Sequence, residues 1–175
     1  MENAHIKISR VWSMPSAWTF TIKPISELLQ RYVGNGKNWI DPFAGKNSPA
    51  EITNDLNPKA PTKYHLEAIE FLKQLDGNKF EGGLYDPPYS LRQIVEVYEG
   101  IGHKVDKKWA TTKFYSESKT FLANKIKVGG IVISFGWNSI GMGKKRGFEI
   151  VEILLVSHGR LHNDTIVTVE VKKYD

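Results

Sequence analysis

Along this chain, short apolar runs typical of strands alternate with helix-patterned segments, and no other feature limits its fold as strongly. Buried parallel strands are continuously apolar and are joined by crossover helices. The alternation therefore predicts an α/β fold, with helices on both faces of a mostly parallel sheet. Two β-rich runs near the end predict an antiparallel strand pair that makes the sheet mixed. The expected strands are 6–8, 38–45 (ending in a tight turn), 52–58, 63–68, 82–85, 131–135, 148–156 and 165–172; the expected helices are 24–33, 69–75, 91–98 and 116–127.

The length and composition limit the class of protein. The 175 residues predict a single domain, residues 1–175, that is long enough to bury a substantial core. The sequence has no cysteine, which excludes disulfide scaffolds, cysteine-ligated zinc and thiolate nucleophiles. No metal site is expected, because His158 and His162 are weak evidence for one. No run is apolar enough to cross a bilayer, and the start lacks a signal-peptide core, so we expect a cytoplasmic protein without a membrane partner.

Four polar or glycine residues fall at the carboxyl ends of predicted strands. These are Gly45, Asp55, Glu67 and Asp86. In an open α/β sheet, ligands bind outside the carboxyl ends of the strands, where neighbouring ends meet. The sequence therefore predicts one ligand site along this edge of the sheet.

The segment Asp86-Pro87-Pro88-Tyr89 carries the chemistry that is easiest to recognise. The two prolines fix φ and donate no backbone hydrogen bond, so the segment is stiff and some carbonyls lack ladder partners. Such a segment can hold a carboxylate and a carbonyl beside an amino group, with the tyrosine ring as a stacking surface. This combination suits chemistry on the exocyclic amine of a nucleobase. The alternative is a Pro-Pro turn in which Asp86 caps the next helix.

Together these residues resemble the amino-methyltransferases of DNA, which transfer a methyl group from S-adenosylmethionine to adenine or cytosine. The family's Asp-Pro-Phe-x-Gly motif is present as Asp41 to Gly45, and its Asp-Pro-Pro-Tyr motif is Asp86 to Tyr89. Its Lys-Pro element resembles Thr21-Ile22-Lys23-Pro24. The resemblance spans about residues 20–140. It implies a Rossmann-like methyltransferase fold with S-adenosylmethionine as the cofactor.

The resemblance also implies roles for individual residues. The methionine end of the cofactor is expected against Thr21, Lys23 and the turn at 41–45. Asp55 is expected to accept from the ribose hydroxyls, with helix capping as its alternative role. Glu67 and Ala68 are expected to flank the adenine, and a structural role is the alternative for Glu67. The implied cofactor-binding set is Thr21, Lys23, Pro24, Asp41, Pro42, Phe43, Ala44, Gly45, Asp55, Asn57, Glu67 and Ala68, and the catalytic set is Asp86, Pro87, Pro88 and Tyr89.

The expected mechanism follows from the weak nucleophilicity of an aromatic amine, whose lone pair is delocalised into the ring. Asp86 and the carbonyl of Pro87 would accept its two hydrogens, which favours the pyramidal, nucleophilic nitrogen. Tyr89 would stack on the base, which contributes roughly 1–3 kcal/mol in comparable sites. In duplex DNA the base must first be flipped out of the helix.

The chain departs from the family pattern in its cofactor loop. Only residues 46–54 separate Gly45 from Asp55, and they include Pro49, so the usual helix there is missing or reduced to a turn. The usual second glycine is replaced by Lys46-Asn47-Ser48. Both departures predict a cofactor pocket that is more open than usual.

Two basic loops are candidates for contact with DNA, which the net charge of +5 permits. They are residues 100–113 and 141–147, and the second carries Lys144, Lys145 and Arg146 between glycines. A solvated turn is the alternative for the second loop. Adenine in DNA is the expected target. Cytosine, RNA, and a non-catalytic nucleic-acid-binding protein on a degenerate methyltransferase fold are the alternatives, although the intact Asp86 to Tyr89 segment argues against the last.

Overall fold

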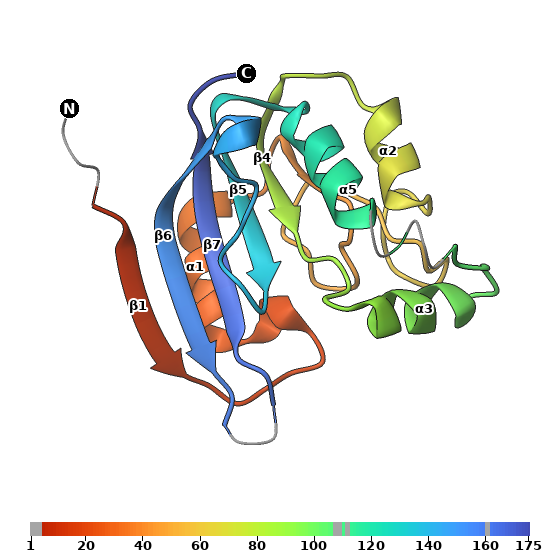
Figure 1. Cartoon of the computed structure of the whole chain (residues 1–175), viewed down its shortest axis with the longest axis horizontal. Helices are drawn as coiled ribbons and strands as arrows, with labels where there is room; N and C mark the ends of the chain where they lie inside the picture. Colours follow the sequence, from red (N-terminus) through yellow and green to blue (C-terminus); the bar gives the residue numbers. More distant parts are fainter. Residues whose placement is uncertain (1–4, 107–109, 111–112, 160–161) are drawn as a thin grey trace.

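In a computed structural model, one seven-stranded sheet organises the described residues, which are 5–106, 110, 113–159 and 162–175. The strand order is β1-β6-β7-β5-β4-β2-β3 (Figure 1). The strands are β1 (Lys7–Trp12), β2 (Trp39–Asp41), β3 (Ile52–Thr53), β4 (Phe80–Tyr85), β5 (Ile126–Gly136), β6 (Phe148–Ser157) and β7 (Thr165–Lys172). The helices are η1 (Thr19–Thr21), α1 (Lys23–Val33), α2 (Ala68–Gln74), α3 (Leu91–Glu99), α5 (Phe114–Ala123) and η2 (Lys144–Arg146).

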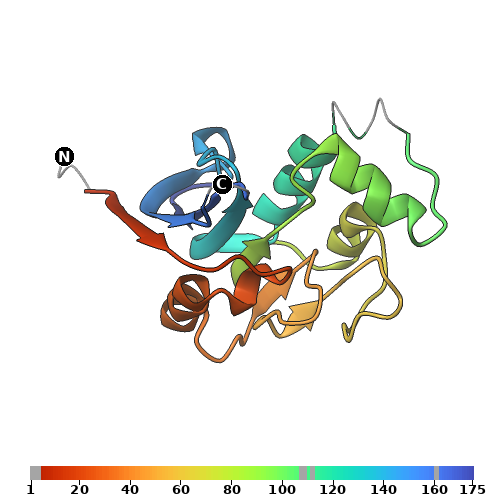
Figure 2. The same ribbon diagram turned by 90° about the horizontal axis from the view of Figure 1, so that it is seen from below.

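The sheet is mixed, as the sequence predicted. Strand β7 pairs antiparallel with both β5 and β6, whereas the other described pairings are parallel. The carboxyl ends of β2, β3, β4 and β5 therefore lie at one edge of the sheet. The segment that follows β1 runs along this same edge to η1 (Figure 2). No helix within the described residues is long and apolar enough to span a membrane.

Helices cover both faces of the sheet, and alternate strand residues show which face each helix covers. Leu84 and Ile133 join the core cluster of α1, which contains Ile25 and Leu28 among its buried residues. Their sequence neighbours Tyr85 and Val132 point the other way and join the cluster of α2 and α5. This period of two places one residue of each pair on each face. Figure 2 shows α1 and α5 on opposite sides of the sheet.

Local signals explain the ends of α1. Pro24 stands in the first turn, where its missing N–H costs nothing. Gly34 ends the helix with φ 59°, in a region that glycine adopts without a Cβ penalty. The helix predicted over 24–33 is confirmed.

The strand predicted over 63–68 is wrong, and that over 52–58 shortens to β3. Their contact is a single bridge between Asn54 and Tyr64. Backbone bonds join Tyr64 to Thr53 and Asp55, but at Leu66 the buried side chain of Asn54 takes the place of ladder bonds. Its Nδ2 donates to the carbonyls of Pro42 and Leu66, and its Oδ1 accepts from Leu66 N. Ala68 belongs to α2 instead of a strand.

The boundary predicted between a helix over 116–127 and the next strand is also wrong. Helix α5 ends at Ala123, and β5 already begins at Ile126. Gly129 and Gly130 lie inside β5, where the pairing with β4 shifts register. Gly129 has φ +83°, and a Cβ on Gly130 would stand 2.6 Å from the Ile126 side chain. The two glycines therefore form an irregularity within the strand.

Candidate functional site

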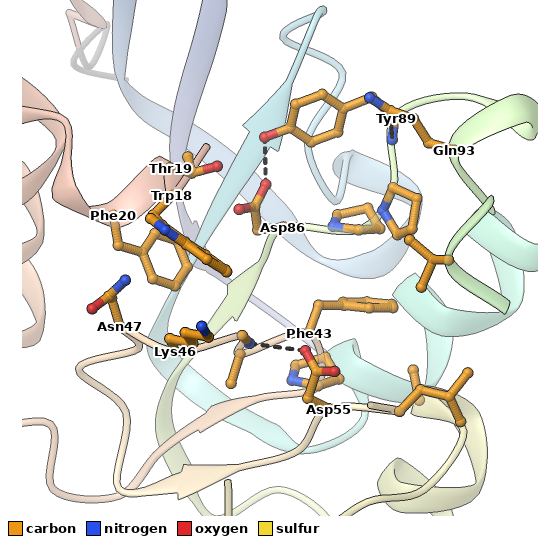
Figure 3. A pocket seen from close by; sticks show the side chains of 18 of the residues that line it. Trp18, Thr19, Phe20, Phe43, Lys46, Asn47, Asp55, Asp86, Tyr89 and Gln93 are labelled. Atoms are coloured by element: carbon orange, nitrogen blue, oxygen red, sulfur yellow. Dashed lines mark hydrogen bonds between the residues drawn. The ribbon is translucent and has the colours of Figure 1, made fainter. Parts of the chain in front are cut away.

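A cavity of about 390 Å³ lies at the carboxyl ends of β2, β3 and β4 (Figure 3). Its wall combines the turn after β2, the segment after β4 and the arm between β1 and η1 (residues 13–18). The lining residues are Ala17, Trp18, Thr19, Phe20, Pro42, Phe43, Ala44, Gly45, Lys46, Asn47, Asp55, Leu56, Leu66, Ala68, Asp86, Pro87, Pro88, Tyr89, Gln93, Val97 and Tyr98. The cavity thus brings together two sequence motifs that lie forty residues apart, 41–45 and 86–89.

Asp86 follows β4 directly and is half-buried at the cavity wall. Its Oδ1 accepts a hydrogen bond from the hydroxyl of Tyr89 (Figure 3). Burial raises the pKa of Asp86 to about 6, although hydrogen bonds from Tyr89 and Thr19 act in the opposite direction. The carboxyl group is therefore held in one orientation and is ionised at neutral pH.

Side chains from two helices hold the segment around Asp86. The amide of Tyr89 donates to Gln93 Oε1 at 2.6 Å. The hydroxyl of Tyr115 in α5 donates to the carbonyl of Pro88, also at 2.6 Å. Ser90 caps α3 by accepting from Gln93 N, so the capping role considered for Asp86 falls to Ser90. With two prolines and these bonds, the segment has little freedom to change its geometry.

On the opposite wall, Gly45 and Asp55 are tied together. Gly45 adopts φ +55°, which closes the turn after β2. Its amide donates to Asp55 Oδ2 at 2.9 Å (Figure 3), and Asp55 Oδ1 accepts from Asn57 N at 2.8 Å. A carboxylate has about four acceptor sites, so Asp55 can accept further bonds from a ligand. Asn57 itself is not among the lining residues.

Asp41 is fully buried behind the turn and does not line the cavity. Its Oδ1 accepts from Phe43 N at 2.9 Å, and its Oδ2 accepts from Ser48 Oγ at 2.6 Å. Burial raises the pKa of Asp41 to about 7. Asp41 therefore organises the turn from inside, whereas Pro42, Phe43, Ala44 and Gly45 form its surface toward the cavity.

Several residues of the predicted cofactor-binding set lie outside the cavity. Glu67 caps α2 through bonds from Ile69 N at 2.7 Å and Glu70 N at 3.4 Å, and it also accepts from the Tyr98 hydroxyl. The contacts of Glu67 thus match the structural role that was its alternative. Ala68, which was also predicted to flank the adenine, does line the cavity. Thr21, Lys23, Pro24, Asp41, Asn57 and Glu67 are the predicted residues that are absent from the lining.

Other lining residues were not predicted from the sequence. Trp18, Thr19 and Phe20 come from the arm and η1, and Gln93 and Tyr98 come from α3. The aromatic residues of the arm and η1 indicated that this segment packs against the domain, because large aromatic side chains seldom lie without packing partners. Lys46 and Asn47 were noted in the sequence only because they replace the usual second glycine of the cofactor loop, and no role was predicted for them.

The predicted basic loop lies at the other edge of the sheet. Residues Lys144–Arg146 form η2 just before β6 begins, which is the edge opposite the carboxyl ends. Arg146 donates to the carbonyls of Met142 and Ser116 and to Thr120 Oγ1, so much of its guanidinium is used inside the protein. The location does not place this loop beside the cavity. In the loop 100–113, Lys107 and Lys108 lie outside the described residues.

His158 follows β6 directly and is buried. Its Nδ1 lies 3.0 Å from the carbonyl of Ser13, and its Nε2 lies 2.9 Å from Thr165 Oγ1. These contacts tie the arm to the sheet. Across the described ranges, no group of three or more His, Cys, Asp or Glu residues could hold a metal ion.

The sequence matches no protein-family model and no curated protein. Solved structures with the same architecture are nevertheless found. TrmN from Thermus thermophilus has a TM-score of 0.57 at 16% identity, over 86% of this chain and 49% of that one. A 1,6-didemethyltoxoflavin-N1-methyltransferase from Burkholderia thailandensis, with bound 1,6-didemethyltoxoflavin and S-adenosylhomocysteine, has 0.56 at 14%, over 87% and 78%. N-methyltransferase NodS from Bradyrhizobium japonicum has 0.53 at 8%, over 87% and 96%.

These likenesses define the class of fold. The chain has the Rossmann-like fold of methyltransferases, with a mixed seven-stranded sheet across the described residues. The chain spans about half the length of the TrmN chain and most of the other two. At these identities the likeness establishes the fold, and the activity has to be argued from the site.

Proposed function

We propose that this protein transfers a methyl group from S-adenosylmethionine to the exocyclic amino group of a nucleobase in DNA, with adenine N6 as the first candidate. The observation that carries the proposal is that Asp86, Pro87 and Tyr89 share one cavity with the Gly45 turn and Asp55. One end of the cavity thus offers acceptors for an amine, and the other offers a turn and a carboxylate for a cofactor.

The cavity suits the cofactor in size and chemistry. A volume of about 390 Å³ falls within the usual range for small-molecule sites. Asp55 keeps acceptor capacity for ribose hydroxyls, and Leu56, Leu66 and Ala68 form apolar wall for an adenine ring. When bound, the cofactor supplies an electrophilic methyl group on sulfur. Two fold neighbours whose names describe N-methyltransferases are consistent with a nitrogen acceptor.

In this proposal the residues after β4 activate the amine. Asp86 is ionised at neutral pH and accepts a hydrogen bond from one N–H of the amino group. The Pro87 carbonyl accepts a hydrogen bond from the other N–H. Tyr89 N donates to Gln93, and Tyr115 donates to the Pro88 carbonyl, so the segment that carries both acceptors is held and little reorganisation is needed when the amine arrives. No covalent intermediate on the protein is required.

An aromatic pair beside Asp86 suits a flat ring. The rings of Tyr89 and Trp137 meet edge to face, with centroids 5.7 Å apart. Trp137 is 42% exposed, which leaves ring surface available for stacking. A base can reach this point only outside a helical stack, so a flipped or single-stranded base is the expected form of the substrate. The same amine occurs in RNA, and the test therefore includes both polymers.

The test is a transfer assay with S-adenosylmethionine labelled in the methyl group. Unmodified DNA and RNA of mixed sequence are offered separately, and digested nucleosides are identified by mass spectrometry. Label in N6-methyladenine from DNA is the expected result, and label in N4-methylcytosine would replace the base. Label only in RNA would overturn DNA as the substrate. The absence of cofactor binding in a calorimetric titration would overturn the proposal altogether.

The proposal predicts an acid limit for activity that depends on Tyr89. Because Asp86 must be ionised to accept from the amine, activity should fall as the pH drops through about 6. In Tyr89→Phe the ring remains but the hydroxyl that stabilises the carboxylate is lost, so the pKa of Asp86 rises further. We expect the acid limb of kcat/KM to move to higher pH in this variant.

Tyr98→Phe is the matched control for this measurement. Tyr98 also lines the cavity, but its hydroxyl donates to Glu67 instead of Asp86. The acid limb of this variant should coincide with that of the unaltered protein. A Tyr89→Phe profile with an unchanged acid limb would show that the hydroxyl does not set the ionisation of Asp86.

A further inference from the structure

We infer that Lys46 binds the carboxylate at the amino-acid end of the cofactor. The inference rests on the proposed function, because it presumes S-adenosylmethionine in the cavity. It assigns to Lys46 the contact that the family resemblance predicted for Lys23. The argument has three parts: the charges that line the cavity, the contacts that Lys46 already makes, and the position of Lys23.

The charges along the cavity leave few choices. Among the described residues that line it, Lys46 is the only lysine or arginine, and Asp55 and Asp86 are the only carboxylates. The cofactor carries a carboxylate on its amino-acid end, and a carboxylate taken from water into a cavity requires a cation or several donors. Lys46 is the lining residue that can supply this charge, and the neighbouring Asn47 offers an amide.

Lys46 is held in place by an aromatic ring instead of a carboxylate. Its Nζ lies 4.9 Å from the ring centroid of Trp18, over the face of the indole. A cation over an aromatic face is attracted by the ring quadrupole, and its three N–H donors remain able to meet an anion. In the part of the chain that the structure describes, no ion pair of Lys46 is found. The side chain is therefore positioned and still available.

The turn after β2 and the arm bring Lys46 and Trp18 together. Gly45 gives its amide to Asp55, and the Trp18 ring packs 3.9 Å from where a Cβ on Gly45 would stand. The arm thus lies against the turn that precedes Lys46. Lys46 follows this turn directly, and Figure 3 shows its side chain beside Asn47 and below the ring of Trp18.

Lys23 has a different location. It is the first residue of α1 and does not line the cavity, although its side chain is exposed like that of Lys46. Thr21, the other predicted contact of the methionine end, donates its hydroxyl to the carbonyl of Trp18 at 2.8 Å. Lys23 is therefore a matched control. It is also a lysine and was predicted to make the same contact, but it does not line the cavity.

The test is isothermal titration of the full chain with two probes. S-adenosylhomocysteine carries the amino-acid carboxylate, whereas 5′-methylthioadenosine keeps the nucleoside and the sulfur but lacks the amino-acid end. Lys46→Met removes the charge and keeps an unbranched stem that still packs on Trp18. We expect S-adenosylhomocysteine to bind Lys46→Met about tenfold more weakly, which corresponds to one charge-assisted contact. Binding of 5′-methylthioadenosine should not change, and Lys23→Met should bind both probes like the unaltered protein.

Other outcomes separate the failures. Equal weakening of both probes in Lys46→Met would overturn the inference, because it would mean that the lysine supports the cavity without meeting the carboxylate. Unchanged binding of S-adenosylhomocysteine would overturn it directly. Weakening in Lys23→Met alone would return the role to Lys23. If the unaltered protein bound neither probe, the proposed function itself would fail, and the inference with it.

Discussion

Replacing Asp86 with alanine is expected to reduce methyl transfer about a thousandfold or more, while cofactor affinity stays within about twofold. The reason is that the Pro87 carbonyl alone would be left to accept from the amine. The lone pair of the amine nitrogen would then stay more delocalised into the ring, so the nitrogen would be a weaker nucleophile. Single-turnover rates with labelled S-adenosylmethionine, together with calorimetric titration, measure the two quantities separately.

Cofactor affinity should change little in Asp86→Ala, because none of the contacts described for Asp86 is with the turn and the carboxylate that are proposed to hold the cofactor. Its carboxylate meets Tyr89 and Thr19, whereas the Gly45 turn is held by Asp41 and Asp55. Asp76→Ala is a suitable control, since this aspartate is exposed and pairs only with Lys79 among the contacts described for it. Asp86→Asn is a second variant that keeps the shape and one acceptor oxygen. Turnover retained in both Asp86 variants would remove this residue from the mechanism.

A large loss of stability is expected from Gly82→Ala in β4. Gly82 pairs with Trp39 across β2 and β4, and the indole lies over the glycine. A Cβ on Gly82 would stand 2.6 Å from three atoms of the Trp39 ring, which is 4% exposed and cannot swing away freely. We expect the free energy of unfolding to fall by about 2–3 kcal/mol, as for overpacked cores. Urea denaturation followed by fluorescence measures it.

Gly136→Ala in β5 is the matched control. Gly136 also lies in a central strand, but nothing stands within 4 Å of its potential Cβ. Its substitution should change the free energy of unfolding by less than about 0.5 kcal/mol. Equal stability losses in the two variants would mean that the packing of Trp39 on Gly82 does not decide the effect.

The course of the main elements could be predicted from the sequence where the signals are local. Helix α1 has both an apolar period of 3.6 and residues that favour its ends, Pro24 and Gly34. The antiparallel pair of β6 and β7 follows from two long β-rich runs. The strand predicted over 63–68 failed because Asn54 satisfies the backbone there with its side chain, and the sequence pattern gives no sign of that.

The candidate site was predictable in part for a similar reason. Gly45, Asp55 and Asp86 follow strands that β-branched and apolar residues make recognisable, and parallel strand ends meet at one edge. The role expected for Glu67 came from the family resemblance, and that of the loop at 144–146 came from its basic sequence. Glu67 instead caps the helix that begins one residue later, which is a local contact, whereas Arg146 bonds to Ser116, thirty positions away along the chain.

The sequence by itself determined the class of fold and the residues with distinctive chemistry, because hydrophobic period, prolines and glycines act over a few neighbouring positions. Only the tertiary structure decided which of those residues share a cavity. Trp18 meets Lys46, and Tyr115 meets the Pro88 carbonyl, across separations of 28 and 27 positions. Such contacts depend on how α5 and the arm pack against the sheet, and packing joins residues whose separation along the chain carries no local signal.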